Sequence, residues 1–507
     1  MTTSTPSGVK SPGNDRLLFG MILGVVAFWL FAQTTLNIAS TMAADLGIEM
    51  SVMNIAVSIT ALFSGIFIVV VGGLADRVGR VKVVQVGFGF GIVGAILVGL
   101  APPGSLATPA LMLGRICQGL SAACIMPASL ALVKAYWDGA GRQRAISLWS
   151  MGSWGGSGFA ALFGGLVAEN VGWRWIFIAC AAVSVIGMLL VHGTPESRAE
   201  ASGRYKLDLK GIATFMVAMV ALQVLVTLGG TLGWASPASL GLFATALVVG
   251  VIFVRVESGN ADAFVDFRLF RNLTYTGATL SNLLLNAVAG IIIVAMTLVQ
   301  VGGGLSAQEA GLLTLGYAIA IVAFIRVGEK LLQRFGARTP MLWGCLIVAA
   351  AILLLMPTNL LLGTYQVLAV IAFTLFGLGL AFYATPSTDA ALANLPDDQT
   401  GAGSGIYKMA SSLGASFGVA ISAAIFTALS ADAGGVNWIP GVITFAGRQD
   451  NLAVREAAIV AFGANLLMIV GAIIAIAFLV PKGKARGDSR ATTSAPAEAA
   501  ARSGSGS

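Results

Sequence analysis

Four charged residues inside or at the ends of long apolar runs mark the places where this sequence could do chemistry. Arg115 lies within one run, Asp389 closes another, Lys408 follows soon after it, and Glu329 ends a third. A charge at the centre of a membrane helix costs about 2.5–3.5 kcal/mol on insertion scales, so its presence there suggests function. The chemistry open to such groups is binding and releasing a proton. An ion pair between Asp389 and Lys408 is feasible, because an adjacent cation favours the charged carboxylate and separation from it favours protonation.

Each of these charges also has a structural interpretation. Arg115 is either the electrostatic partner of a proton site or a donor to carbonyl groups of the first helix. Asp389 and Lys408 form either a protonation switch or a permanent salt bridge. Glu329, the alternative proton carrier, stands three residues after Arg326, a spacing at which opposite charges pair on one helix.

The sequence contains no constellation typical of catalysis or metal binding. Its one histidine, His192, stands near the end of an apolar run, and its four cysteines lie within apolar runs without metal-ligand spacing. The absence of a G-x-x-x-x-G-K-S/T loop argues against ATP as the energy source. We therefore expect no enzyme, no metal and no cofactor. The net charge of +7 includes no basic cluster interleaved with aromatics, so nucleic acid is not an expected partner.

The composition places these charges in a polytopic membrane protein. Of 507 residues, 57% are hydrophobic and 10% are charged, whereas soluble domains carry about 25% charged residues. Runs of about 20 apolar residues can cross a lipid bilayer as helices. The sequence predicts fourteen of them, at 17–40, 54–72, 82–101, 108–134, 144–168, 173–193, 209–230, 237–256, 274–300, 307–328, 340–356, 364–388, 403–430 and 457–480.

The connections between these spans alternate in charge. One set carries most of the Lys and Arg residues, while the other holds only Arg174, Arg448 and Arg455 near its helix ends. Because basic loops stay in the cytoplasm, this asymmetry predicts an even number of spans with both termini cytoplasmic. It also predicts an external loop over 431–456.

Residues 72–83 read GGLADRVGRVKV and form the short turn between two spans. Glycines let helix ends approach closely. The stretch resembles the G-x-L-A-D-R-x-G-R-(R/K) signature between helices 2 and 3 of major facilitator transporters, which implies that its acid locks the cytoplasmic side. The alternative is a basic turn without a gating role. The motif residues are Gly72, Gly73, Asp76, Arg77, Gly79 and Arg80.

A weak internal repeat divides the chain. EKLLQRFGAR places Leu331, Arg334 and Gly336 where the first motif has leucine, arginine and glycine, while Gln333 replaces the acid. We therefore expect two pseudo-symmetric halves of six helices with two helices inserted between them. The expected boundaries are a disordered tail over 1–15, the first half over 16–205, the inserted pair over 206–260, the second half over 261–481 and a disordered tail over 482–507.

Further stretches resemble the fourteen-helix drug:proton antiporters of the major facilitator superfamily. LGRICQGLSAACIMPASL resembles their fourth helix with its buried arginine, and SWGGSGFAALFGGLVAENVGWRWIFI their fifth-helix glycine motif. FGLGLAFYATPSTDAALANLP and GIYKMASSLGASFGVAI resemble their paired late helices. The resemblance covers about 17–480 and is close to the quinolone-resistance efflux pumps. The glycines it points to are Gly156, Gly164 and Gly165.

Two departures from the family pattern affect the expected coupling. The family often has D-x-T-x-x-N in its first helix, but Ala32 or Gln33 stands at the acid position here. The fifth helix usually has Gly-Pro before its glycine pair, but this chain has Ala160-Ala161. The missing first-helix acid turns attention to Asp389.

A central cavity can be predicted from side chains that share helical faces. Aromatic and weakly polar linings suit flat, lipophilic and often cationic compounds. Helix packing is the alternative explanation for each single residue. The predicted lining residues are Trp29, Gln33, Asn37, Asn282, Asn286, Tyr317, Phe324, Phe376 and Tyr383.

The sequence thus predicts an all-α membrane protein with the major facilitator fold. The resemblance implies a monomer in a bacterial cytoplasmic membrane that expels small-molecule drugs, such as quinolones and dyes, in exchange for protons. A proton-coupled exporter or importer of an endogenous metabolite is the second hypothesis. A membrane-embedded enzyme is the third, and the single histidine argues against it.

Overall fold

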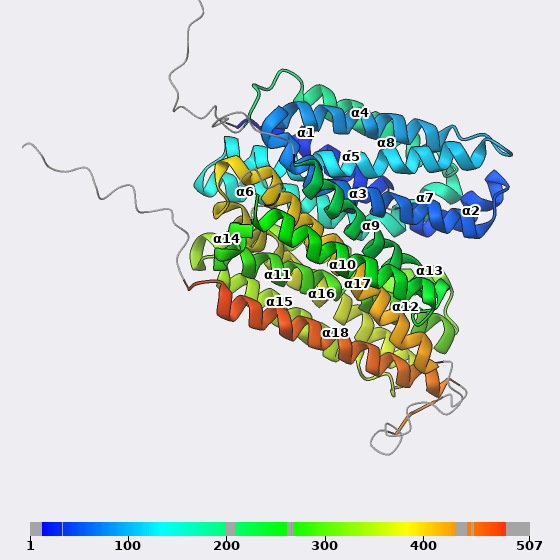
Figure 1. The fold of residues 1–507 in the computed structure, drawn as a ribbon. Helices are drawn as coiled ribbons and strands as arrows, with labels where there is room; N and C mark the ends of the chain where they lie inside the picture. The colour runs from blue at the N-terminus through cyan, green and yellow to red at the C-terminus, as the bar shows by residue number, and fades with distance from the viewer. Residues whose placement is uncertain are drawn as a thin grey trace, which may run out of the picture.

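The fold of the chain was established from a computed structural model, which describes residues 13–32, 34–198, 208–260, 265, 267–430, 444–447 and 451–482. Figure 1 shows a bundle of long helices that run in roughly the same direction. Within the described residues, twelve helices are long and apolar enough to cross a membrane. The predicted all-α membrane fold is confirmed.

The predicted spans 17–40 and 144–168 are not among these twelve. Both are helical in their described residues, but a π-helical segment interrupts each of them. The count of fourteen spans therefore stays a prediction. Single π-turns inside α-helices are frequent at functional sites.

The N-terminal half comprises the helices before the inserted pair. Their apolar faces pack into two clusters of buried side chains, one toward each end of the bundle. The elements are α1 (Asp15–Val26), η1 (Ala27–Ala32), α2 (Thr35–Leu46), α3 (Met50–Val78), α4 (Arg80–Gly99), α5 (Ala107–Tyr136), α6 (Gly139–Ser150), η2 (Met151–Gly155), α7 (Gly156–Asn170) and α8 (Arg174–Val191).

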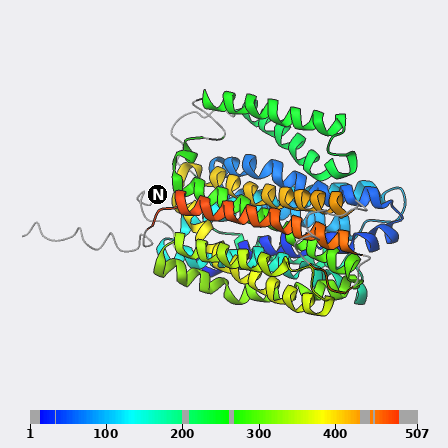
Figure 2. The same cartoon turned by 90° about the horizontal axis from the view of Figure 1, so that it is seen from below.

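The inserted pair consists of α9 (Leu209–Leu232) and α10 (Pro237–Ser258). Figure 2 shows these two helices on one side of the bundle. α9 packs against both α3 and α17, so it lies at a seam between the two halves. α10 contacts mainly α9 and exposes Leu240, Phe243, Leu247 and Val251, as expected of a lipid-facing helix.

The C-terminal half has its own core of buried side chains. α18 begins at Leu452, five residues before the expected start of the last span. Most of the loop predicted over 431–456 lies outside the described residues. The elements are η3 (Phe267–Arg271), α11 (Leu273–Ala287), α12 (Gly290–Thr297), η4 (Leu298–Gly302), α13 (Ala307–Leu313), α14 (Leu315–Phe335), α15 (Arg338–Leu355), α16 (Leu362–Ala393), η5 (Asp397–Gln399), α17 (Thr400–Ser430) and α18 (Leu452–Leu479).

The two halves meet along two seams. α17 packs against α3 and α5 at one seam, while α14 and α16 pack against α6 and its neighbours at the other. One cluster of buried side chains crosses between the halves: it joins Val69 and Ala75 of α3 to Ala390 of α16 and to Leu395 and Tyr407. This cluster lies at the end of the bundle that carries Gly79, which we call the motif end. In this conformation the halves are closed at the motif end.

Candidate functional site: the closed motif end between the halves

The carboxylate of Asp76, in the last turn of α3, reaches the other half of the molecule. Its Oδ2 accepts hydrogen bonds from the backbone N–H groups of Gly401 at 2.7 Å and Ala402 at 3.2 Å. These groups begin α17, where the helix N-terminus carries partial positive charge and unpaired donors. Asp76 is only 2% exposed, so this charge-assisted contact is formed away from water.

Arg80, in the first turn of α4, connects this carboxylate to two other segments. Its guanidinium donates to Asp76 Oδ1 from Nε at 2.9 Å and from Nη2 at 2.7 Å. Nη2 also donates to the backbone oxygen of Asp397 at 2.7 Å, across the halves, and Nη1 donates to Ser197 Oγ at 3.3 Å. Arg80 is buried, so its charge is balanced mainly by Asp76.

Glycines allow α3 and α17 to touch at backbone distance. A Cβ atom added at Gly72 would overlap the carbonyl oxygen of Gly401, and one added at Gly401 would overlap that of Gly72. Gly405 repeats the close approach one turn further along, since a Cβ added there would lie 2.8 Å from the oxygen of Ile68. Gly73 is buried beside this contact and Arg77 is half-buried. Gly79 has φ +128° and ends α3, a conformation that favours glycine.

Asp389 forms an ion pair across the halves, but its partner is Arg142 rather than Lys408. Arg142 Nε lies 2.9 Å from Asp389 Oδ1, and both side chains are largely buried. Lys134 of α5 adds a second cross-half contact by donating to the carbonyl oxygen of Leu395. The expected Asp389–Lys408 pair is therefore wrong for this conformation. A cation from the other half replaces the one from the neighbouring helix.

Lys408 instead contacts an aromatic ring of the N-terminal half. Its Nζ lies 4.3 Å from the ring centroid of Trp149, and both residues are buried. Trp149 is held in place because its Nε1–H donates to Ser129 Oγ at 2.9 Å. Sequence reasoning missed Trp149 and Arg142 as partners. Both belong to α6, and the sequence of that helix does not indicate which helices of the other half these two side chains contact.

Arg115 is fully buried and binds within its own half. Its Nε donates to the carbonyl oxygen of Ala56 at 3.1 Å, and its Nη1 donates to Thr35 Oγ1 at 3.0 Å and to Gln118 Oε1 at 2.8 Å. Among the described contacts, the carbonyl bound by Arg115 belongs to α3, and Thr35 lies within the predicted first span. The guanidinium joins α2, α3 and α5 near the end opposite the motif.

Glu329 pairs with Arg326 on the same helix, as the spacing predicted. Gln333, which occupies the position of Asp76 in the repeat, donates to Glu329 Oε1 at 3.3 Å. The second copy of the motif thus forms contacts within α14. The described hydrogen bonds of the motif ends are asymmetric between the two halves.

Of the predicted cavity residues of the N-terminal half, the structure describes the side chain of Trp29. Trp29 lies in η1, half-buried, and a Cβ at Gly156 would come within 3.2 Å of Trp29 Cβ. Gly164 lets Thr34 approach, since a Cβ there would overlap the threonine methyl group, whereas the space at Gly165 is open. Gln33 and the side chain of Asn37 lie outside the described residues.

In the C-terminal half, Asn282 is buried against α17, and Asn286, half-buried, bonds to Asn282 on the same helix. Asn282 Nδ2 donates to Tyr407 O at 2.9 Å and to Ser411 Oγ at 2.6 Å, and Asn286 Nδ2 donates to Asn282 Oδ1 at 3.0 Å. Tyr383 is fully buried, with its hydroxyl 2.7 Å from Ser281 Oγ. These contacts join α11, α16 and α17.

The remaining predicted aromatic residues divide into a contact pair and an exposed ring. Tyr317 and Phe376 are buried with ring centroids 5.4 Å apart, and a Cβ at Gly158 would lie 3.3 Å from Tyr317 Cε1. Tyr317 therefore touches α7 of the other half. Phe324 of α14 is 44% exposed. Whether these rings bind substrate stays a prediction.

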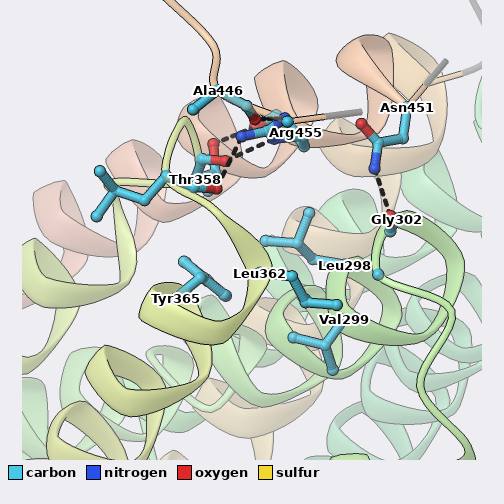
Figure 3. Close-up of a pocket in the computed structure, with 12 residues that line it drawn as sticks. Leu298, Val299, Gly302, Thr358, Leu362, Tyr365, Ala446, Asn451 and Arg455 are labelled. Atoms are coloured by element: carbon cyan, nitrogen blue, oxygen red, sulfur yellow. Dashed lines mark hydrogen bonds between the residues drawn. The ribbon is translucent and has the colours of Figure 1, made fainter. Parts of the chain in front are cut away.

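A pocket near the opposite end of the C-terminal half contains none of the predicted cavity residues (Figure 3). Leu298 and Val299 of η4 form its apolar wall, and Tyr365 of α16 lies beside them. Arg455 closes it by donating to the backbone oxygens of Thr358 at 2.6 Å and Leu360 at 3.0 Å. Because these contacts lie within one half, the pocket does not cross the interface.

A fold of two halves, closed at one end by a motif that joins them, defines a class of membrane transporter. The family model described as Major Facilitator Superfamily matches residues 18–299 and 276–501. The chain belongs to the major facilitator superfamily.

Curated relatives share more sequence identity with this chain than a shared fold alone would require. The chain is 46% identical over 425 residues to "Quinolone resistance protein NorB" of Staphylococcus aureus (strain MRSA252), which covers 84% of this chain and 91% of that protein. The protein of the same name from strain bovine RF122 / ET3-1 gives the same values.

Solved structures agree in fold at low sequence identity. The proton:xylose symporter XylE, bound to 6-bromo-6-deoxy-D-glucose, superposes with a TM-score of 0.62 at 14% identity, covering 93% of this chain and 96% of that one. The human organic anion transporter MFSD10 (TETRAN) gives 0.56 at 15% identity, covering 91% and 100%.

Proposed function

We propose that this protein is a proton-driven multidrug exporter of a bacterial cytoplasmic membrane. It moves amphipathic, often cationic or zwitterionic compounds such as quinolones and dyes outward by alternating access. The similarity to proteins named for quinolone resistance, over 84% of the chain, supports the substrate class. The observation that carries the mechanism is the capping of α17 by Asp76, because it joins the two halves through contacts that can break and re-form.

Alternating access follows from where these contacts lie. Asp76, Arg80 and Arg142 of one half hold Gly401, Asp397 and Asp389 of the other, all at the motif end. Rocking the halves apart at this end would break these contacts together. The basic residues around the motif support a cytoplasmic position for this end, so the described conformation is the one closed to the cytoplasm.

Proton coupling in this proposal acts through Asp389. A proton that neutralises its carboxylate removes the ion pair with Arg142, which weakens closure of the motif end. Release of that proton to the cytoplasm restores the charge and favours closure again. The contact between Asp389 and Arg142 would therefore be proton-dependent even though the first helix lacks its usual acid.

Drug binding in this proposal takes place between the halves, near the π-helical break at Trp29 and the aromatic pair of Tyr317 and Phe376. Stacking and cation–π contacts with such rings suit flat lipophilic cations and tolerate varied shapes. Asn286, half-buried on α11, adds a polar group without charge. Few specific hydrogen bonds are expected, which fits a broad substrate range.

The test is accumulation of ethidium and norfloxacin in an efflux-deficient host that expresses the chain. We expect lower accumulation of both compounds than in cells with an empty vector, and loss of the difference when a protonophore is added. Higher accumulation in expressing cells would indicate import. No difference for either compound would favour an exporter or importer of an endogenous metabolite.

A further inference from the structure

The internal repeat places two helix starts in equivalent surroundings at the motif end. α4 begins after Gly79 and α15 begins after Gly336 and Ala337, and both glycines have positive φ, +128° and +74°. α4 packs against α8, the last helix of its half, and α15 packs against α18, the last helix of the other. Figure 1 shows α15 and α18 side by side.

In the N-terminal half, the segment after α8 supplies an anion to this place. Glu196 Oε1 accepts the backbone N–H of Val81 at 2.9 Å, and Oε2 accepts that of Lys82 at 3.1 Å. The carboxylate thereby caps the first turn of α4, where an anion is stabilised by unpaired N–H groups and by the helix dipole. Glu196 follows Pro195 in the sequence.

In the C-terminal half, the equivalent segment carries the opposite charge. After α8 the chain passes through Pro195 and Glu196, and after α18 it passes through Pro481 and Lys482, so a residue of opposite charge follows the proline in each half. The first turn of α15 has no side-chain cap, and its Arg338 and Thr339 line a crevice together with Lys482. Two cations thus face the start of α15. Pro340, at the position of Lys82 counted from the helix start, has no N–H, so Thr339 offers the one backbone donor that corresponds to those binding Glu196.

The crevice has a volume of about 310 Å³, enough for a small polar headgroup. None of its lining residues is acidic; they are Phe335, Arg338, Thr339, Leu342, Trp343 and Lys482. Arg338 Nη2 donates to the carbonyl oxygen of Ala477 at 2.6 Å, while its buried Nε has no hydrogen-bond partner in the described part of the chain. The guanidinium of Arg338 therefore has hydrogen-bonding capacity that its described contacts do not use.

The surface next to the crevice is apolar and follows both helices toward the middle of the bundle. Trp343, Leu346 and Leu353 are exposed along α15, and Ile474 and Phe478 are exposed along α18. Trp343 and Phe335 pack edge to face, with centroids 5.4 Å apart, at the mouth of the crevice. Tryptophan is enriched where lipid headgroups meet the acyl region.

We propose that this crevice binds the phosphate headgroup of an anionic phospholipid, whose acyl chains lie along α15 and α18. The lipid phosphate supplies to α15 the negative charge that Glu196 supplies to α4. Basic pockets between membrane helices bind anionic headgroups in this way. The continuous apolar surface favours a lipid over free phosphate, because only the lipid gains by covering it.

The test is native mass spectrometry of the full-length protein released from nanodiscs of equal parts phosphatidylglycerol and phosphatidylcholine. We expect at least fivefold more retained phosphatidylglycerol than phosphatidylcholine. Lys482→Glu, which restores the charge found at Glu196, should reduce retained phosphatidylglycerol at least fivefold. Lys330→Gln removes an exposed cation of α14 outside the crevice and should leave retention unchanged.

A second measurement separates the lipid from free phosphate and does not depend on transport. Increasing inorganic phosphate should not displace the retained lipid, since phosphate lacks the acyl contacts. Displacement by phosphate at millimolar concentration would overturn the lipid assignment. Equal retention of the two lipids, or full retention by folded Lys482→Glu, would overturn the proposal as a whole.

Discussion

Asp76 and Gly401 lie in different halves of the molecule, and the Asp76 carboxylate caps the first turn of α17, where its Oδ2 accepts the N–H of Gly401 at 2.7 Å. The contact combines a charge, a helix N-terminus and two glycine backbones that touch. Each component can be altered by a single substitution, and each alteration has a distinct expected effect on closure of the motif end.

Asp76→Asn removes the charge but keeps an amide oxygen in place. Hydrogen bonds to charged groups contribute about 1.5–3 kcal/mol each, so losing the charge shifts the equilibrium between closed and open forms by roughly ten- to a hundredfold. We expect normal expression and a strong loss of ethidium efflux. Asp398→Asn, which changes an exposed acid close to the same interface, should transport normally. Normal efflux by Asp76→Asn would reduce the motif to a topology signal.

Gly401→Ala tests the backbone contact without changing any charge. The added methyl group overlaps the carbonyl oxygen of Gly72, so the two halves can no longer approach closely enough to close the motif end. We expect lower efflux, together with faster labelling of a cysteine introduced at Ser404, which is buried when the end is closed. Gly65→Ala on α3 has open space around the new methyl group and should affect neither measurement.

The sequence was sufficient to predict the parts of the site that depend on local spacing. The pairing of Glu329 with Arg326 required only an i, i+3 relation on one helix. The glycines of the turn were expected to bring its own two helix ends together, whereas Gly72 contacts Gly401 of α17 in the other half. Partners across the halves could not be predicted, because Asp389 has several cations within reach of its helix, and the packing of α6 decides that Arg142 is the one that binds.

The surroundings of the predicted cavity illustrate the same limit. Helical spacing placed Asn282 and Asn286 on one face of α11, and the structure shows Asn282 bonded to α17 and Asn286 bonded to Asn282. Helical spacing could not distinguish a face that packs on α17 from one that contacts a ligand, because both place polar groups in an apolar environment. The π-helical segments at η1 and η2 leave no periodic sign in the sequence.

Arg115→Ala is expected to reduce stability rather than coupling alone. The guanidinium joins three helices through Ala56, Thr35 and Gln118, and its removal leaves buried acceptors unpaired at a cost of about 1–3 kcal/mol each. We expect a clear drop in melting temperature in detergent, measured by size-exclusion chromatography after heating. Arg174→Ala, at a partly exposed ion pair, should lower it much less. A melting temperature unchanged by Arg115→Ala would indicate a role in coupling instead.

Trp29→Ala and Asn282→Ala separate substrate contact from helix packing. Trp29 is half-buried and its Nε1 has no hydrogen-bond partner in the described residues, so its removal should alter the relative efflux of ethidium and norfloxacin. Asn282 is bonded to Tyr407 and Ser411, so its removal should lower stability and reduce both activities equally. The ratio of the two efflux rates, compared with the melting temperature, is the measurement. An unchanged ratio for Trp29→Ala would remove it from the cavity.

Asp389→Asn addresses the proton directly. Its carboxylate pairs with Arg142 of the opposite half, so the environment of its charge changes when the halves separate. Glu329 pairs with Arg326 of its own helix, so we expect the two residues to move together and the surroundings of Glu329 to stay the same. We therefore expect drug-induced proton release from proteoliposomes to be lost in Asp389→Asn and largely kept in Glu329→Gln. Arg142→Gln should also weaken closure without removing the titratable group, so it should slow transport yet preserve some proton release. The opposite result for the two acids would assign the proton to Glu329 and make Asp389–Arg142 a structural latch.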